Sequence, residues 1–277
     1  MGSTNALVKE AKRLFHGRGQ NQNYNIDYFP PYVVVDSFVD FDEAQKKEII
    51  TKFPEAEGVF YRNRKKREEF TALAGKIPSK HLLIENDLKY EISFEGNQNI
   101  GFFMDMKPGR ELIQNLSKDK TVLNLFSYTC SFSVAAKAGG CKKVVNVDMK
   151  KSFLKTGERN HQLNNLSGNV QYLSYEIMKS LSGLQKKGPW DIIVVDPPSQ
   201  QKSFNLEKDY PKLLKRASDW LSSGGHLLAC INSPFHQSEF LINNCPDLKV
   251  SKVLYGAFEE ADLESGLKMV LFEKPKS

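Results

Sequence analysis

An aspartate followed by two prolines is the feature of this sequence best suited to chemistry. Asp196, Pro197 and Pro198 follow a fully apolar run in the stretch WDIIVVDPPSQQKSF. Prolines lack a backbone N–H and hold the chain extended, so carbonyl oxygens would stand beside a carboxylate at the end of a buried strand. Such an acceptor-rich pocket suits the flat amine or amide edge of a nucleobase. A plain turn is the alternative that the motif leaves open.

Polar residues also follow other strands that we expect. Asp148 ends the run VVNVD, where a carboxylate can accept hydrogen bonds from ribose hydroxyls or cap the next helix. Glu176 follows the next strand and would either meet an adenine amine or only begin a helix. Asn232 ends the run HLLACIN and offers an amide donor and acceptor. Lys202 lies in the loop after the two prolines, and we expect it to contact phosphate.

These residues are expected at one edge of a sheet, because strands and helices alternate in the second half of the chain. The alternation predicts a doubly wound α/β fold, with a mostly parallel sheet and helices on both faces. Two further strands near the end predict an antiparallel hairpin at the sheet edge. Ligands bind at the carboxyl ends of such strands, near the switch in strand order. The seven expected strands cover residues 121–126, 144–148, 170–173, 191–196, 226–232, 249–256 and 267–274.

The turn after the first of these strands contains no glycine between Asn124 and Phe132. A dinucleotide-binding sheet normally has G-x-G-x-x-G at this place, because glycines let the backbone approach a pyrophosphate. The sequence therefore argues against a nicotinamide or flavin oxidoreductase. A cofactor without a pyrophosphate does not need that approach, and an ordinary strand-to-helix turn is the alternative that this stretch leaves open.

Residues 1–110 have a different pattern, and we expect them to form a smaller, β-rich α+β domain before a second domain over 111–277. One helix is expected over 41–53, a strand over 100–106, and an amphipathic helix over 1–17. The basic segment YRNRKKREEF places cations beside aromatic residues, which suits a surface that binds and stacks on RNA. A solvated hairpin loop is the alternative. The cations of this segment are Arg62, Arg64, Lys65, Lys66 and Arg67.

Composition and charge limit the classes of protein that fit. The chain has 277 residues, 40% of them hydrophobic and 26% charged, and a net charge of +6, which is compatible with a nucleic-acid partner. No apolar run approaches the roughly 18 residues of a membrane span, and no secretory signal is recognisable. The four cysteines form no CxxC pair, which argues against structural zinc. We expect a cytoplasmic protein without a metal or membrane partner, and the sequence leaves a homodimer open.

Several motifs together resemble the class I S-adenosylmethionine-dependent methyltransferases that modify bacterial large-subunit ribosomal RNA. The stretches VLNLFSYTCSFSVAAKAGG, KVVNVDM, ERNHQLNNL and DIIVVDPPSQQKSF carry the likeness, which covers about residues 95–273. They are similar to the group that methylates cytosine C5 or guanine N7, and to a subgroup without a PUA RNA-binding domain. The resemblance implies a Rossmann-like seven-stranded methyltransferase domain, S-adenosylmethionine as the cofactor, and a base of 23S ribosomal RNA as the substrate.

The resemblance also implies roles for single residues. Asp148 would bind the cofactor ribose, Met149 would lie against the adenine, and the segment before the catalytic domain would close the pocket. Glu176 stands where the family usually has Asp, and Cys130 stands where relatives often have Gly. The implied methyl-transfer residues are Asp196, Pro197, Pro198 and Asn232. The implied cofactor residues are Phe103, Asp105, Arg110, Asn124, Phe126, Tyr128, Thr129, Asp148, Met149, Glu176 and Asp196.

One departure from the family bears on the atom that is methylated. Enzymes that methylate cytosine C5 need a cysteine nucleophile that attacks C6, and Asn232 stands where relatives have that cysteine. Cys230 lies deeper in the strand, where we expect a small buried side chain. We therefore expect transfer to a nitrogen of an RNA base. The alternatives are methylation of a protein or small molecule, and a non-catalytic RNA-binding protein that kept the fold.

Overall fold

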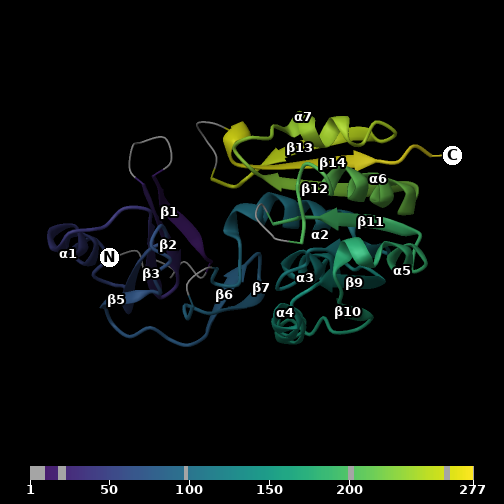
Figure 1. Cartoon of the computed structure of the whole chain (residues 1–277). Helices are drawn as coiled ribbons and strands as arrows, with labels where there is room; N and C mark the ends of the chain where they lie inside the picture. The colour runs from purple at the N-terminus through teal and green to yellow at the C-terminus, as the bar shows by residue number, and fades with distance from the viewer. Residues whose placement is uncertain (1–9, 18–22, 97–98, 199–202, 259–262, 277) are drawn as a thin grey trace, which may run out of the picture. The chain divides into compact units, whose positions relative to one another are not determined.

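The chain divides into two compact units in the computed structural model, which describes residues 10–17, 23–96, 99–198, 203–258 and 263–276 (Figure 1). One unit is Met1–Met104 and the other is Asp105–Ser277. The predicted boundary after Arg110 would cut through helix α2 (Lys107–Leu116). The division lies earlier, within the 3₁₀ turn Met104–Met106 that leads into this helix.

The first unit is an α+β domain built on a five-stranded sheet of order β1-β2-β3-β4-β5. Strands β3 and β4 are parallel because helix α1 connects them, and the other neighbours are antiparallel. Strands β6 and β7 form a separate hairpin. The bounds are β1 Lys12–His16, β2 Tyr24–Phe29, β3 Tyr32–Ser37, α1 Glu43–Lys52, β4 Gly58–Asn63, β5 Thr71–Ala74, β6 His81–Glu85 and β7 Leu88–Ile92.

Two elements predicted for this unit are wrong within the described residues. Residues 12–16 form strand β1 rather than part of a helix, because Arg13 and its neighbours pair with β2, where Asp27 binds the Arg13 guanidinium. Residues 100–106 form no strand, and the segment ends in the 3₁₀ turn before α2. The predicted helix over 41–53 is α1. It begins after Asp42, whose carboxylate accepts a hydrogen bond from the Gln45 N–H.

The second unit confirms the predicted α/β fold with a seven-stranded sheet of order β10-β9-β8-β11-β12-β14-β13. The first five strands are parallel, and β14 runs antiparallel to both β12 and β13. The strand order switches between β8 and β11, which is where such sheets bind ligands. The bounds are β8 Thr121–Leu125, β9 Lys143–Asp148, β10 Val170–Ser174, β11 Trp190–Val195, β12 Leu221–Asn232, β13 Lys249–Tyr255 and β14 Leu267–Glu273.

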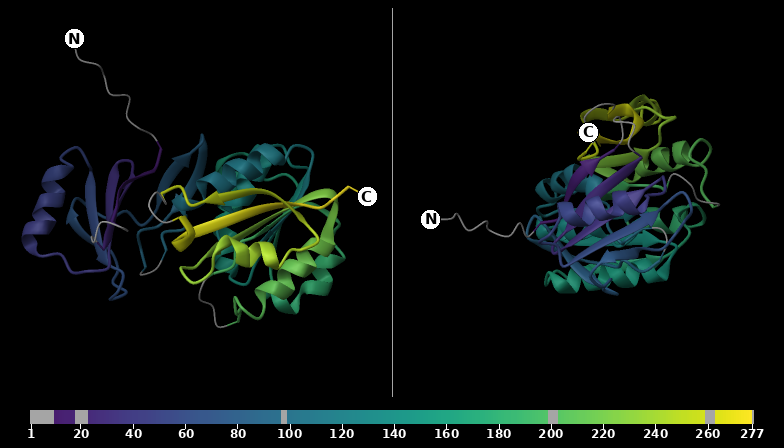
Figure 2. Two further views of the ribbon diagram at one scale, coloured as in Figure 1. Left: turned by 90° about the horizontal axis from the view of Figure 1, so that it is seen from above. Right: turned by 90° about the vertical axis from the view of Figure 1, so that its left-hand side faces the viewer.

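Helices cover both faces of this sheet (Figures 1 and 2). The cluster that joins the sheet to α2 and α3 includes Ile192 and Val194 of β11, and the cluster with α5, α6 and α7 includes Ile193 and Val195. Burial on both faces explains why the run before Asp196 is apolar at every position. The helices are α3 Ser131–Ala138, α4 Lys151–Leu163, α5 Leu181–Gln185, α6 Tyr210–Trp220 and α7 Ser238–Asn243, with 3₁₀ turns at Ile177–Lys179 and Leu263–Ser265.

Candidate functional site

The candidate site lies at the carboxyl edge of the seven-stranded sheet, on both sides of the switch in strand order. Leu125 of β8 pairs with Val195 of β11 and with Val147 of β9. The residues that follow are Phe126, Asp196 and Asp148, so these three lie in one row at the strand ends. The structure thus brings the two predicted acids to the same edge.

Asp148 holds the turn after β8 through its carboxylate. Its Oδ2 accepts a hydrogen bond from the Tyr128 N–H at 3.0 Å, and its Oδ1 accepts one from the Lys150 N–H at 2.9 Å. Burial raises the pKa of Asp148, and these two N–H groups oppose that rise. Each carboxylate oxygen has a further lone pair, so Asp148 remains able to accept two hydroxyl donors of a ribose.

The turn after β8 contains three non-glycine residues in the left-handed region of backbone space. Phe126, Tyr128 and Cys130 have φ values of 55°, 46° and 65°. Side chains disfavour this region, and residues held there concentrate at ligand sites. The backbone N–H groups of this turn are used inside the protein: Ser127 donates to the Val147 carbonyl oxygen at 3.0 Å, Cys130 to that of Ser127 at 2.7 Å, and Tyr128 to Asp148. The turn is therefore fixed by its own hydrogen bonds and by Asp148.

Helix α4 supports the turn at Cys130. A Cβ added to Gly157 would overlap the Cys130 Sγ, so the helix has a glycine where the loop has a side chain. Asn160, also on α4, donates a hydrogen bond from Nδ2 to the Thr129 carbonyl oxygen at 2.9 Å. The side chain of Cys130, at a position where relatives often have glycine, thus fits because helix α4 has a glycine opposite it.

The other predicted residues of the turn divide into buried and accessible ones. Asn124 is buried on β8, and its amide donates to Asn146 Oδ1 at 3.0 Å. Contrary to the prediction, we assign its side chain to a polar network under the site and not to cofactor contact. The half-buried rings of Phe126 and Tyr128 pack against aromatic neighbours. The centre of the Phe126 ring lies 4.9 Å from that of Phe204, and the centre of the Tyr128 ring lies 4.5 Å from that of Phe153.

Met149 and Glu176 lie at the outer part of this edge. Met149 follows Asp148 and is 47% exposed, and its Sδ lies 3.8 Å from Ser203 Oγ. Glu176 precedes a 3₁₀ turn, and its carboxylate pairs with Lys179 Nζ at 2.6 Å. The adenine contacts of both residues stay predictions. Phe103 belongs to the first unit and has an exposed ring, so its predicted contact with the cofactor also stays a prediction.

Asp196 is half-buried at the end of β11, between Val195 and the two prolines. Burial, reinforced by the nearby Asp105 carboxylate, raises the pKa of Asp196 to about 7, whereas the Arg110 guanidinium acts in the opposite direction. Asp105 and Arg110, both predicted from the family likeness, thus lie within electrostatic reach of Asp196. A carboxyl group with a pKa near neutrality can take up or release a proton under working conditions.

The end of β12 lies beside Asp196. Val195 of β11 pairs with Ala229 of β12, so Asn232 stands further along the neighbouring strand, where its side chain is exposed. Cys230 is fully buried, as predicted, and burial raises the pKa of its thiol well above the ordinary value. A buried protonated thiol is a poor nucleophile. Asn232 is therefore accessible to a substrate, whereas Cys230 is not.

The loop after β12 is held by side chains and presents an aromatic ring. Ser233 Oγ lies 2.9 Å from His236 Nδ1 and accepts a hydrogen bond from the Phe235 N–H at 3.2 Å. The buried Lys268 Nζ donates to the carbonyl oxygens of Ser233 at 2.5 Å and of Glu264 at 2.8 Å. Phe235 is 90% exposed. Sequence reasoning missed Phe235 and Lys268, although an aromatic residue after Ser-Pro at a strand end was a usable signal for the first.

The basic segment of the first unit divides into buried and exposed cations. Arg62 is only 2% exposed, pairs with Asp36 and lies 4.1 Å from the centre of the Phe70 ring. The prediction that Arg62 binds RNA is therefore wrong in this structure, because its guanidinium is used inside the unit. Lys65 and Arg67 are exposed. Arg64 lies 3.7 Å from Asp36, Lys66 pairs with Asp40 at 2.8 Å, and Lys202 lies outside the described residues.

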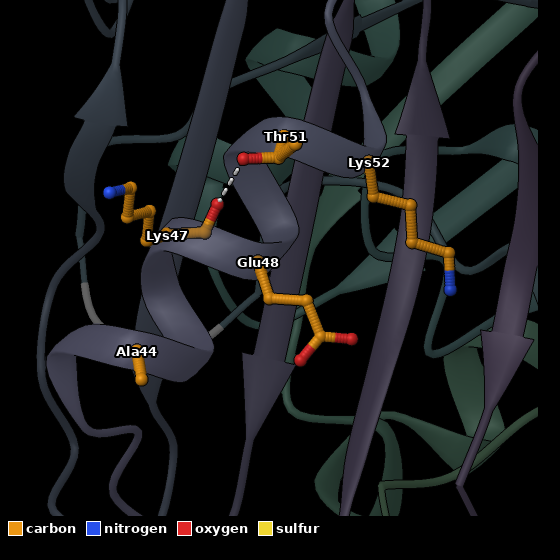
Figure 3. A pocket seen from close by; sticks show the side chains of 5 residues that line it. All are labelled: Ala44, Lys47, Glu48, Thr51 and Lys52. Carbon is orange, nitrogen blue, oxygen red and sulfur yellow. Dashed lines mark hydrogen bonds between the residues drawn. The ribbon is translucent and has the colours of Figure 1, made fainter.

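An open hollow on the outer face of α1 is a different feature of the first unit (Figure 3). Two lysines and a glutamate line it, and Thr51 donates a hydrogen bond to the Lys47 carbonyl oxygen at 2.9 Å. None of the predicted site residues lines it, so we assign it no catalytic role. Its lining residues are Ala44, Lys47, Glu48, Thr51 and Lys52.

Metal clusters and membrane helices are not found in the part of the chain that the structure describes. No group of three or more His, Cys, Asp or Glu side chains in those ranges is placed to hold a metal ion. Likewise, none of the helices in those ranges has the length and apolar character needed to cross a bilayer.

Comparisons with known proteins agree with this geometry. The sequence model of a family described as S-adenosylmethionine-dependent methyltransferase matches residues 59–273. Ribosomal RNA large subunit methyltransferase I of Pseudoalteromonas translucida is 32% identical over 73% of this chain and 50% of its own length. Ribosomal RNA large subunit methyltransferase K/L of a Psychrobacter species is 29% identical over 74% of this chain and 25% of its own length.

A solved structure extends the similarity to the whole described fold. The structure of SMU.776 in complex with SAH (S-adenosylhomocysteine) has a TM-score of 0.87 at 26% identity, and the match covers 96% of this chain and 76% of that one. The chain spans no more than half the length of the two curated relatives above.

Proposed function

Because this chain belongs to the S-adenosylmethionine-dependent methyltransferase family, we propose that it transfers the methyl group of that cofactor to a nitrogen of an RNA base. The proposal rests mainly on one observation. Asp148 and Asp196 lie in one row at the same edge of the sheet, on opposite sides of the point where the strand order switches. The names of the curated relatives support large-subunit ribosomal RNA as the source of the base.

The cofactor would lie along the ends of β8 and β9. Asp148 has lone pairs left for the ribose hydroxyls, and the exposed Met149 beside it offers an apolar surface for the adenine. The turn from Phe126 to Cys130, which Asp148 binds through the Tyr128 N–H, would form the wall of the cofactor pocket next to the ribose. These residues fit the cofactor of the family, which supplies an electrophilic methyl group when it is bound.

The base would lie between the ends of β11 and β12. Pro197 and Pro198 provide no N–H donors, so the acceptors beside Asp196 can receive the amine hydrogens of a base edge. Asn232 can orient the same edge from the neighbouring strand. A base nitrogen that carries hydrogen, such as an exocyclic amine, must lose a proton when it is methylated, and Asp196, with a pKa of about 7, is suited to accept it. Orientation and one proton acceptor are then the main requirements.

The cofactor part of the proposal is tested by calorimetry of S-adenosylmethionine with the full chain. We expect binding by the wild type and at least about a tenfold loss for Asp148→Ala, because two charge-assisted hydrogen bonds to the ribose disappear. Glu158→Ala, which removes an exposed carboxylate from α4, is the control and should bind as the wild type does. Absence of binding by the wild-type protein would contradict the proposal.

The substrate part is tested by mass spectrometric mapping of ribosomal RNA from cells with and without this protein. We expect one methylated base nitrogen to depend on the protein. An unchanged RNA pattern together with a methylated protein or metabolite would favour the alternative substrates. RNA binding without any methyl transfer would favour the non-catalytic alternative.

Transfer to nitrogen is tested separately by removing the buried thiol. Cys230→Ala should retain most of the activity, because Cys230 is inaccessible and its thiol stays protonated. Denaturing gels of the wild type mixed with RNA should show no covalent protein–RNA species. A trapped adduct that disappears in Cys230→Ala would instead show transfer to carbon through a thiolate.

A further inference from the structure

Phe235 is the most exposed large apolar side chain among the residues that the structure describes. It is 90% exposed, whereas the other exposed large apolar side chains of those residues are 36–49% exposed. Folding buries almost none of the apolar surface of this ring, so the ring contributes little to the core and remains available to a partner. We propose that Phe235 is a stacking platform that binds the face of the target base.

The loop that carries Phe235 is fixed at several points. Ser233 contacts His236 and caps the Phe235 N–H, and the preceding Pro234 restricts the backbone. The Lys268 ammonium, fully buried on β14, binds the Ser233 carbonyl oxygen. A ring on such a loop can be placed before the substrate arrives, so less conformational entropy is lost on binding.

Phe235 also lies on the correct strand for this role. The loop begins at Ser233, directly after Asn232 at the end of β12, and β12 adjoins β11, which ends at Asp196. The polar groups of Asp196 and Asn232 are suited to the edge of a base, whereas an aromatic ring is suited to its face. Nucleobases stack on aromatic side chains whatever their identity, so the platform would provide affinity and leave the choice of base to the polar residues. This assignment rests on the proposed RNA substrate.

The experiment compares Phe235→Ala, Phe235→Trp and Val250→Ala in the full chain. The assay is transfer of a labelled methyl group to ribosomal RNA purified from cells that lack the protein, and cofactor binding is measured by calorimetry. We expect kcat/KM for RNA to fall about ten- to hundredfold in Phe235→Ala, with cofactor affinity unchanged. Phe235→Trp should keep near-wild-type activity because an indole also stacks. Val250→Ala, an exposed position at the opposite end of the sheet, should change nothing.

A second measurement does not depend on methyl transfer. The chain has 2 tryptophans, Trp190 and Trp220, and both are buried. The indole introduced by Phe235→Trp is therefore the accessible fluorophore, and the same ribosomal RNA should quench its emission and shield it from acrylamide.

The outcomes separate this inference from the proposed function. If the wild type methylates RNA but Phe235→Ala is as active as the wild type, the platform is refuted and the function stands. If no RNA is methylated but the RNA quenches the indole, Phe235 contacts RNA, but the proposed reaction fails and with it the assignment to a target base. If the RNA does not quench the indole, the stacking assignment is wrong. It is also wrong if Phe235→Ala lowers the rate of methyl transfer to a protein but not to RNA.

Discussion

Asp196 shows how single residues set the chemistry of this sheet edge. Asp196 is half-buried at the end of an apolar strand, within electrostatic reach of the carboxylate of Asp105 and the guanidinium of Arg110. Burial and Asp105 favour the protonated form, and Arg110 favours the ionised form. The balance places the pKa of Asp196 at about 7, where a small change in the surroundings changes its protonation.

The pH dependence of the reaction follows from this balance. If ionised Asp196 accepts the proton of the base, log(kcat/KM) should rise between pH 5 and pH 8 with a midpoint near the pKa of about 7, and then level off. Asp105→Asn should move the midpoint to lower pH, because a cause of the raised pKa is removed. The folded-state pKa lies above the ordinary 3.8, so the contribution of Asp196 to stability should decrease as pH rises from about 4 to about 7.

Rate profiles of the wild type and Asp105→Asn, together with cofactor affinity at each pH, check this prediction. A midpoint that stays unchanged in Asp105→Asn would show that another group titrates. A midpoint that rises in this variant would contradict the assigned electrostatics.

The sequence identified acids at strand ends more reliably than it identified accessible basic residues. Asp148 and Asp196 follow apolar runs, and the period of the pattern fixes where such strands end. Arg62 is next to several other cations in the sequence and does not differ from them there. Its burial depends on Asp36 in a different strand and on Phe70. Such long-range pairing leaves no local signal, so the prediction for Arg62 was wrong.

At the scale of elements, the turn after β8 depends on helix α4. The turn has left-handed residues without glycines, and the space for Cys130 is provided by Gly157 of the helix. The absence of glycines from this turn is visible in the sequence. The contact between Gly157 and Cys130 is not, because it joins residues far apart in the chain. The short strand β1 was missed for a similar reason, since its pairing with β2 is what fixes it as a strand.

Gly157→Ala should destabilise the second unit by about 1–3 kcal/mol, because the added methyl group overlaps Cys130 Sγ in a packed region. Gly183→Ala in α5 is the matched control, since a Cβ there meets nothing within 4 Å. This control should be neutral or stabilising by up to about 1 kcal/mol. Urea unfolding followed by tryptophan fluorescence reports on this unit, because both tryptophans belong to it.

The double variant Gly157→Ala with Cys130→Gly tests the cause of the effect. Removing the Cys130 side chain makes room for the methyl group, so a part of the lost stability should return. If the double variant is no more stable than Gly157→Ala, the overlap with Cys130 is not the cause.

At the scale of the whole molecule, the two units carry different expected tasks. The second unit contains Asp148 and Asp196, whereas the first contains exposed cations at Lys65 and Arg67, for which the described residues include no acidic partner. We expect the first unit to contribute binding to the phosphate backbone and the second to select and methylate the base. The sequence indicated this division, although the boundary lies at the turn before α2.

Lys65→Ala with Arg67→Ala should weaken RNA binding and make it less dependent on salt. Removing two phosphate contacts should lower the slope of log affinity against log salt concentration by about 2. Lys47→Ala with Lys52→Ala removes the same charge from the α1 hollow and should leave the slope nearly unchanged. Fluorescence anisotropy of a ribosomal RNA fragment over a salt series measures both. Equal slopes for the two double variants would remove Lys65 and Arg67 from the RNA-binding surface.

The contact between Cys130 and Gly157 also makes the effect of a substitution at one position depend on the residue at the other. While Cys130 is present, a side chain at position 157 overlaps its Sγ, whereas a glycine at position 130 would leave room for that side chain. The turn that is predicted to bind the cofactor and helix α4 therefore accept changes at these two positions together more readily than one at a time.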